Sequence, residues 1–130
     1  MASLRKIIHL RSGRIEFDEF CALGYVKSNI NFDEDDRVSF LNACLDHYNG
    51  HPFGYISVRE HSYSINPMIY TELNKVESLK AFAIVSDTSI GRGNAEIEGK
   101  FYKKPFGIFG AKEDAIQWMN EEIIKAIEKE

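Results

Sequence analysis

The 130-residue sequence lacks the features that mark a secreted, membrane-spanning or nucleic-acid-binding protein. It has only two cysteines, Cys21 and Cys44, which lie among apolar neighbours in no metal-ligand spacing, so we expect buried free thiols. No apolar run approaches the ~20 residues that a membrane span needs, and the N-terminus does not resemble a signal peptide. The formal net charge of −4 argues against a nucleic-acid binder, and the only basic clusters are the short Arg5-Lys6 and Lys103-Lys104. These absences predict a cytoplasmic protein with no nucleic-acid partner and no membrane span.

Motifs that support catalysis or cofactor binding are also missing. No Gly-x-Ser-x-Gly elbow of a serine hydrolase occurs. The acidic run at residues 33–36 lacks the alternating oxygen ligands and central glycine of a calcium loop. His47 and His51 are separated by the helix-breaking Asn49-Gly50 and have no third zinc ligand, and Gly91-Arg92-Gly93 lacks the third glycine of a dinucleotide-binding turn. We therefore expect a protein that is not an enzyme and has no cofactor and no metal site.

The second half of the sequence has the pattern of a parallel α/β protein. Residues 80–85 and 106–109 form short, continuously apolar runs, as is typical of strands covered on both faces. Residues 53–58 give a third run of this kind, which we expect to be the central strand. Segments with helical periodicity separate and follow these runs, and such an alternation predicts successive right-handed βα turns.

The N-terminal part is antiparallel in style. Runs of β-type residues at 6–11 and 14–17 flank Ser12-Gly13, which predicts a hairpin, and a third run at 20–26 continues it. The sequence thus predicts a single α/β domain over residues 1–130, with a mostly parallel sheet and an antiparallel N-terminal edge. An exposed edge strand of this kind is compatible with a homodimer.

Helices are expected at residues 33–48, 66–76, 88–102 and 111–128. Asp33 or a neighbour can cap the first, and Asn66 precedes Pro67 at the start of the second. Glu121 and Lys125 are spaced to form an ion pair in the last helix. The residues expected to face the sheet are Val38, Leu41, Cys44, Leu45 and Tyr48, then Ile69, Leu73 and Val76, then Ile90, Asn94, Ile97 and Phe101, and finally Ala115, Ile116, Trp118, Met119, Ile123, Ala126 and Ile127.

Aromatic residues are concentrated near the C-terminal strand and helix. Two interpretations remain open: the cluster fills the core, or it lines an apolar pocket between the sheet and the helices that carries a small lipophilic ligand. The cluster consists of Phe101, Tyr102, Phe106, Phe109 and Trp118.

Two stretches resemble the SpoIIAA-like (STAS-type) domain family and small uncharacterised bacterial proteins of that group. The first is Lys104-Pro105-Phe106-Gly107-Ile108-Phe109 with the following Lys112-Glu113-Asp114-Ala115-Ile116-Gln117-Trp118, and the second combines residues 55–59 with residues 63–67. The resemblance implies a regulatory or protein-interaction module without catalytic residues or cofactor. In anti-sigma-factor antagonists of this group, a serine at the start of the helix after the central strand is phosphorylated. Ser62 and Ser64 occupy that neighbourhood as candidate phosphoacceptors, although the Asp-Ser-x-Gly pattern of those proteins is absent.

Polar turns follow the carboxyl ends of the expected parallel strands, where ligands and partners of open α/β sheets gather. Residues 59–66 form a longer polar and aromatic run than a helix cap requires, and Ser86 or Asp87 can cap the next helix. We therefore expect a regulatory protein partner or an anion to bind at Arg59, Ser62, Tyr63, Ser64, Asn66 and Asp87.

Overall fold

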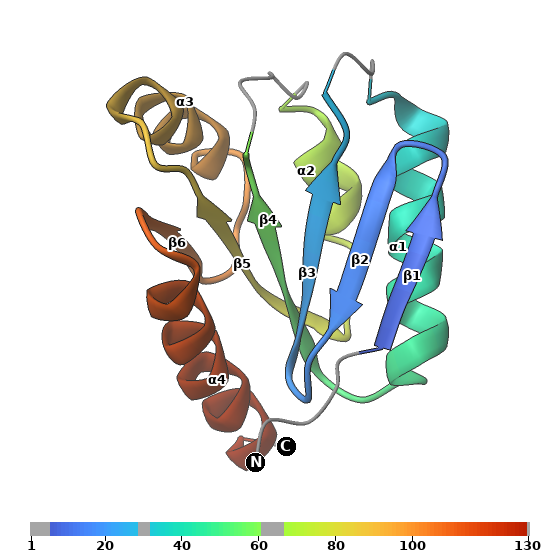
Figure 1. Ribbon diagram of the computed structural model, residues 1–130. Helices are drawn as coiled ribbons and strands as arrows, with labels where there is room; N and C mark the ends of the chain where they lie inside the picture. Colours follow the sequence, from blue (N-terminus) through green and yellow to red (C-terminus); the bar gives the residue numbers. More distant parts are fainter. Residues whose placement is uncertain (1–5, 29–31, 61–66, 130) are drawn as a thin grey trace.

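A computed structural model of the protein describes residues 6–28, 32–60 and 67–129. It contains a six-stranded sheet with helices on both of its faces (Figure 1). The strands are β1 (Lys6–Leu10), β2 (Gly13–Phe17), β3 (Cys21–Val26), β4 (Phe53–Val58), β5 (Leu79–Val85) and β6 (Phe106–Phe109). The helices are α1 (Glu34–Tyr48), α2 (Ile69–Leu73), α3 (Ser89–Gly99) and α4 (Lys112–Glu128).

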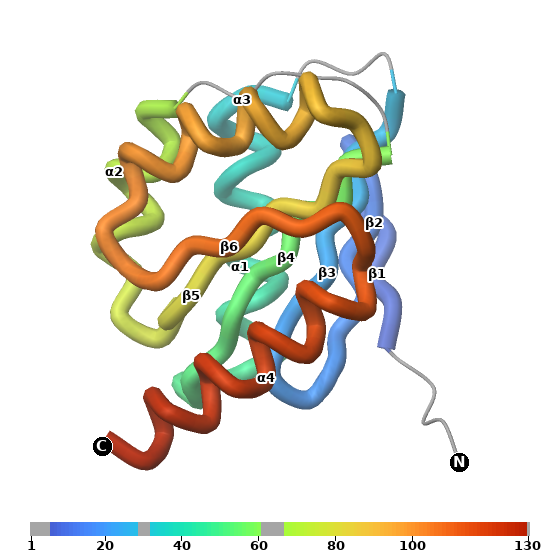
Figure 2. Tube along the Cα trace, turned by 90° about the vertical axis from the view of Figure 1, so that its left-hand side faces the viewer, coloured from blue at the N-terminus to red at the C-terminus, as the bar shows by residue number. Residues whose placement is uncertain are grey.

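The strands lie side by side in their order along the chain. β1, β2 and β3 pair antiparallel, and β3 to β6 pair parallel. The predicted α/β architecture with an antiparallel N-terminal edge is therefore confirmed. Because β3 to β6 all run in one direction, their carboxyl ends lie at one rim of the sheet and their amino ends at the opposite rim (Figures 1 and 2).

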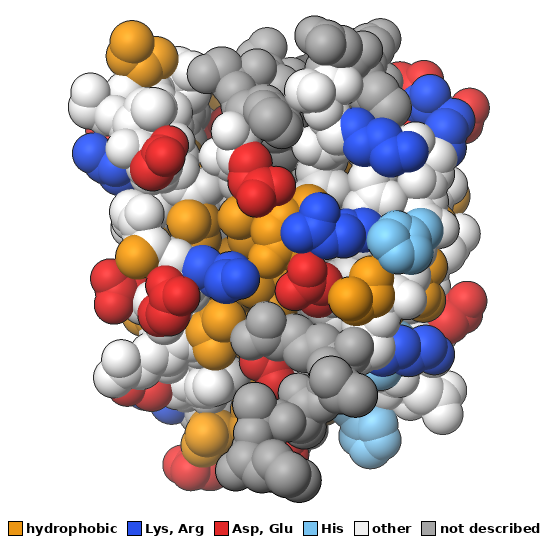
Figure 3. All heavy atoms as spheres, in the orientation of Figure 1, with side chains coloured by type: hydrophobic (Ala, Val, Ile, Leu, Met, Phe, Trp, Pro, Cys, Tyr) orange, Lys and Arg blue, Asp and Glu red, His pale blue; other side chains and the backbone are white. Residues whose placement is uncertain are grey.

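The helices divide unequally between the two faces. α1, α2 and α3 contribute buried residues to one core cluster, whereas α4 alone covers the other side with Ala115, Met119 and Ile123. α4 packs so closely that a Cβ built on Gly54 of β4 would lie 2.0 Å from the Met119 sulfur. The sheet beyond α4 is open to solvent on this face, where charges of both signs surround apolar side chains (Figure 3).

The burial of β5 on both of its faces explains why its sequence is continuously apolar and does not alternate with polar residues. Phe82 and Ile84 point into the cluster under α1 to α3, and Ala81 and Ala83 point into the cluster under α4. Both faces of this strand are thus buried, as its composition predicts. None of the helices in the described part of the chain is long and apolar enough to cross a membrane.

α1 begins and ends where the sequence predicts. The Asp33 side chain accepts a hydrogen bond from the Asp36 backbone N–H (3.1 Å), and the Asp36 side chain accepts one from the Asp33 N–H (3.0 Å). Asn49, in the left-handed conformation with φ of 50°, ends the helix. The predicted inward stripe is wrong at Val38, which is 38% exposed. The buried row follows four-residue spacing instead, at Asp36, Phe40, Cys44 and Tyr48.

α2 and α4 differ in part from the prediction. α2 is shorter than predicted, because Pro67 and Met68 form a turn before Ile69; the predicted cap Asn66 lies outside the described residues. In α4, Ile127 is 42% exposed. Lys125 pairs with Glu122 (3.2 Å), three positions away.

α3 is turned differently from the prediction. Ile90, Ile97 and Phe101 were expected to face the sheet, yet they are 77%, 54% and 41% exposed. The buried residues of the helix are Ala95 and Glu98. Glu98 has a charged partner beneath the helix, and this contact determines which side of α3 faces the sheet.

The predicted aromatic cluster is also divided. Tyr102 and Phe106 pack with Phe82 on the face that α1 to α3 cover, whereas Phe109 and Trp118 contact one another on the α4 face, with ring centroids 5.5 Å apart.

Candidate functional site

The carboxyl rim of the parallel strands brings two of the predicted polar turns together. The Arg59 backbone N–H donates to Val85 O (2.9 Å), and the Ser86 N–H donates to Phe109 O (3.0 Å). Arg59 and Ser86 therefore lie at the ends of neighbouring strands, and Asp87 beside them is exposed. The remaining predicted site residues, Ser62, Tyr63, Ser64 and Asn66, lie outside the described residues, so their proposed roles in recognition and phosphorylation stay predictions.

Arg59 turns into the protein and pairs with Glu98 of α3. Its guanidinium donates to both carboxylate oxygens, with N···O distances of 2.5 and 2.7 Å, and its Nε donates to the Ser57 hydroxyl at 3.3 Å. The two side chains are only 5% and 6% exposed. Tyr70 of α2 donates a third hydrogen bond to Glu98, at 2.7 Å. One carboxylate thus connects α2, α3 and the end of β4.

This network is the main electrostatic feature of the buried interior at the rim. Burial raises the pKa of the Tyr70 phenol above its usual range, and the Glu98 charge raises it further, so the hydroxyl remains protonated and donates. The two hydrogen bonds from Arg59 and the third from Tyr70 supply the donors that the buried Glu98 carboxylate needs. The anion that Arg59 binds is the Glu98 carboxylate, and an external anion would have to take the place of Glu98.

The start of α3 is closed by its own local contacts. The Thr88 hydroxyl accepts from the Gly91 N–H (3.0 Å) and is the helix cap, rather than Ser86 or Asp87 as predicted. The Arg92 guanidinium donates to the Ser86 carbonyl (2.9 Å). A Cβ built on Gly91 would lie 2.0 Å from the Ser86 hydroxyl oxygen, so this glycine permits the close approach of strand end and helix.

The outer side of α3 carries three exposed apolar residues, Ile90, Ile97 and Phe101, which we call its apolar face. The exposed Asn94 lies between Ile90 and Ile97 on the same side. Ile90 and Ile97 are seven positions apart, which places them on one side of a helix two turns from each other. Phe101 follows at the next turn, just beyond the last helical residue. Sequence periodicity correctly placed these residues on one face of the helix, but the prediction that this face packs against the sheet was wrong.

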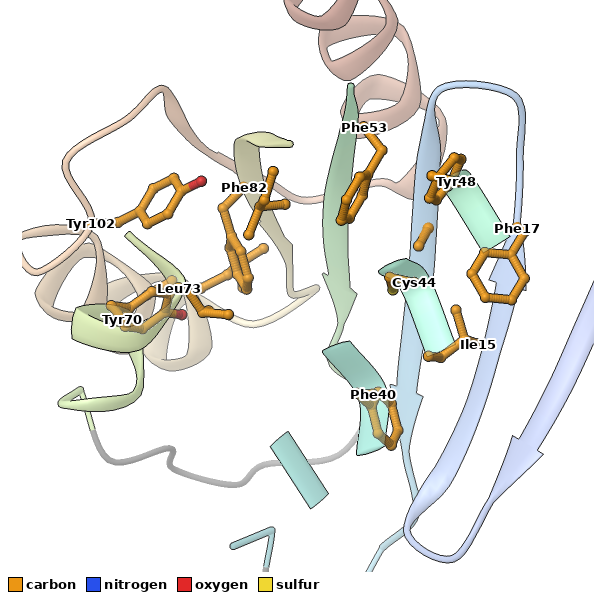
Figure 4. Close-up of a cluster of buried hydrophobic side chains, with 14 residues drawn as sticks. Ile15, Phe17, Phe40, Cys44, Tyr48, Phe53, Tyr70, Leu73, Phe82 and Tyr102 are labelled. Atoms are coloured by element: carbon orange, nitrogen blue, oxygen red, sulfur yellow. The ribbon is translucent and has the colours of Figure 1, made fainter. Parts of the chain in front are cut away.

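A small cavity lies between α1, α2 and the sheet. Its volume is about 50 Å³, and its lining includes Phe40 and Cys44 of α1, Tyr70 of α2, and Phe53 and Phe82 of the sheet. Figure 4 shows these side chains in two groups, one under α1 and one under α2. Sites for drug-sized ligands measure roughly 300–1,000 Å³, so this space does not admit a lipophilic ligand without movement of the helices. Burial raises the pKa of the Cys44 thiol to about 12, which makes this thiol unreactive.

Within the described ranges, His, Cys, Asp and Glu residues form no group of three or more that could hold a metal ion.

The sequential six-stranded sheet, antiparallel at its N-terminal edge and flanked by βα units, is the architecture of a SpoIIAA-like fold. The crystal structure of an uncharacterized protein of the DUF3478 family from Shewanella loihica PV-4, which has a SpoIIAA-like fold, matches this chain with a TM-score of 0.54. The match covers 92% of this chain and 98% of that one, at 14% sequence identity. No family model and no curated protein matches the sequence. The SpoIIAA-like fold predicted from the sequence is confirmed. At 14% identity, the similarity between the two proteins shows a shared fold and nothing further.

Proposed function

We propose that this protein is a non-enzymatic regulatory module of the STAS/SpoIIAA-like type, and that it binds a protein partner through the apolar face of α3. The partner supplies a complementary apolar surface that covers Ile90, Ile97 and Phe101.

The inverted orientation of α3 carries this proposal. A helix that packs only for stability turns its large apolar residues inward, whereas α3 turns Ala95 and Glu98 inward and exposes Ile90 and Ile97. Covering a fully exposed Ile side chain is worth roughly 1.5–3 kcal/mol. Clusters of exposed apolar side chains on a small protein are characteristic of interaction sites.

The polar groups at the carboxyl rim support a role without catalysis. Arg59 is occupied by Glu98, the Thr88 hydroxyl caps α3, and Arg92 holds the Ser86 carbonyl. These side chains fix the position of α3 on the sheet. They act as the support of a docking helix rather than as acids, bases or nucleophiles.

Carriage of a small lipophilic ligand is the alternative. The position of the apolar cavity between α1 and α2 favours this alternative, but the cavity volume of about 50 Å³ argues against it. A carrier would require α1 and α2 to separate, and we therefore rank partner binding first.

The proposal is tested by affinity purification from the native host with three immobilised forms of the protein. The wild type is compared with Ile90→Ser/Ile97→Ser and with Glu96→Ser, an exposed control position on the same helix. We expect one defined partner to be recovered by the wild type and by Glu96→Ser and to be lost from the double variant, with the melting temperature unchanged.

Two outcomes contradict the proposal. One is recovery of the same proteins by all three forms, which would place recognition outside α3. The other is recovery of no specific partner by the wild type.

A further inference from the structure

A groove at the amino rim of the parallel strands gathers lysines from four separate segments. They come from the residue that follows the α2 C-cap, the start of β5, the connection before β6 and the end of α4, which lie together on one side of the molecule (Figure 2). We call this surface the lysine groove. Its lysines are Lys75, Lys80, Lys103, Lys104, Lys125 and Lys129.

The groove reverses the charge of the protein locally. Six lysines and two glutamates, Glu77 and Glu122, line it, which is an excess of four positive charges in the lining. Glu72, which pairs with Lys75 from outside the lining, reduces the local excess to three. The whole chain has a formal net charge of −4, so the residues outside the lining carry an excess of eight negative charges. The open face of the sheet shows mixed charges instead (Figure 3). A field of one sign confined to a groove attracts a ligand of the opposite sign.

Two of these lysines, Lys80 and Lys104, lie close enough for their charges to interact. Lys104 turns inward and donates to the carbonyls of Val76 and Leu79, both at 2.6 Å. Burial lowers the pKa of Lys104, and the nearby charge of Lys80 lowers it further. Lys75 and Lys125, by contrast, are 68% and 65% exposed, although each touches a glutamate. Carboxylates from outside would reduce this repulsion and find exposed ammonium groups to pair with.

We propose that the lysine groove binds an acidic peptide segment of a partner protein. The groove has a volume of about 730 Å³, and Pro105 and Ala126 lie in its wall. This is room for a short stretch of chain with carboxylates and small apolar side chains. The net negative charge of the rest of the chain disfavours a long polyanion or a charged membrane, which would extend past the lysines. This inference rests on the lysine groove alone and does not depend on the apolar face of α3.

The test measures binding of a fluorescein-labelled peptide of alternating Glu and Ala by fluorescence anisotropy. The groove variant is Lys103→Gln/Lys125→Gln/Lys129→Gln, which leaves the inward-facing Lys104 intact. The control variant is Lys6→Gln/Lys27→Gln/Lys112→Gln, which changes net charge equally at positions outside the groove lining. Circular dichroism and melting temperature confirm that both variants are folded.

We expect the wild type and the control variant to bind the peptide and the groove variant to bind it at least about tenfold more weakly. Binding should also weaken roughly tenfold between about 0.05 M and 0.5 M salt, because salt screens exposed charges. Absence of binding to the wild type, or equal loss in both variants, overturns the proposal. So does tighter binding of a DNA duplex or of phosphatidylserine vesicles than of the peptide, if the groove variant abolishes it.

Discussion

Glu98→Gln should destabilise the protein strongly, although it replaces only one heavy atom, a carboxylate oxygen by an amide nitrogen. The substitution leaves the Arg59 charge without its counter-charge, in a site where that side chain is 5% exposed. Removing one partner of a buried ion pair costs about 3–5 kcal/mol. Because an amide can keep part of the hydrogen bonding, we expect about 3 kcal/mol. That is a large fraction of the roughly 5–15 kcal/mol that stabilises a typical domain. At about 4 °C per kcal/mol for a protein of this size, the melting temperature should fall by about 12 °C.

Replacing the whole network by apolar residues should restore most of this loss. The variant Arg59→Met/Glu98→Leu/Tyr70→Phe removes the charge pair together with the phenol that donates to it, so no buried charge is left unpaired. The Ser57 hydroxyl loses only its long contact with the Arg59 Nε, at 3.3 Å. We expect its free energy of unfolding to lie within about 1 kcal/mol of the wild type. The exposed neighbour Glu96→Gln should change stability by less than about 0.5 kcal/mol.

Urea denaturation, followed by circular dichroism and by the fluorescence of the single tryptophan, measures these differences. The reasoning is refuted if Glu98→Gln lies within about 0.5 kcal/mol of the wild type. It is also refuted if the triple apolar variant is less stable than Glu98→Gln.

Three further predictions concern α3, the cysteines and the cavity. Gly93→Ala should stabilise the protein by about 0.5–1 kcal/mol, since a Cβ there meets nothing within 4 Å. Gly91→Ala should destabilise it, because a Cβ there would collide with the Ser86 hydroxyl. The melting temperatures of the two variants should therefore shift in opposite directions. Cys21 and Cys44 are buried and should resist a thiol reagent until the protein unfolds. Burial raises the pKa of Cys44 from 9.0 to about 12, so the contribution of this thiol to stability should be complete below pH 9 and lost as the pH rises toward 12. Denaturation at several pH values tests this dependence. Native mass spectrometry of protein purified from its own host should show the mass of the chain without a retained fatty acid, and a stoichiometric apolar ligand would favour the carrier alternative.

The strands could be predicted closely because their sequences leave few alternatives. The apolar runs at Phe53–Val58 and Phe106–Phe109 coincide with β4 and β6. The hairpin follows from the short connection between β1 and β2, and the parallel order follows from the helical crossovers between the later strands. The Asp33 cap and the Asn49 stop are local signals, and local signals can be read without knowledge of the fold.

The orientation of α3 could not be predicted from periodicity. Apolar spacing indicates which residues share a face, but it places that face inward only by assumption. Here the inward face is selected by Arg59, which lies 39 positions before Glu98 in the sequence and contacts it only because the fold brings the end of β4 beneath α3. Arg59 itself was predicted to bind an anion, and its nearest anion proved to be internal.

The lysine groove was missed for a related reason. Lys103-Lys104 is a short basic cluster in the sequence and does not by itself indicate a binding site. Lys75, Lys80, Lys125 and Lys129 are dispersed, and only the fold brings them to the same rim. Net charge describes the whole chain and gives no indication of such a local reversal.

Photo-crosslinking tests most directly the claim that α3 docks a partner. A benzoylphenylalanine in place of Ile97 lies on the apolar face of α3, and one in place of Asp46 lies on the exposed side of α1 as a control. After irradiation in the native host, we expect one crosslinked species of defined mass from position 97 and none from position 46. Equal crosslinking at both positions, or a position-97 product that contains only a second copy of this chain, would contradict the account.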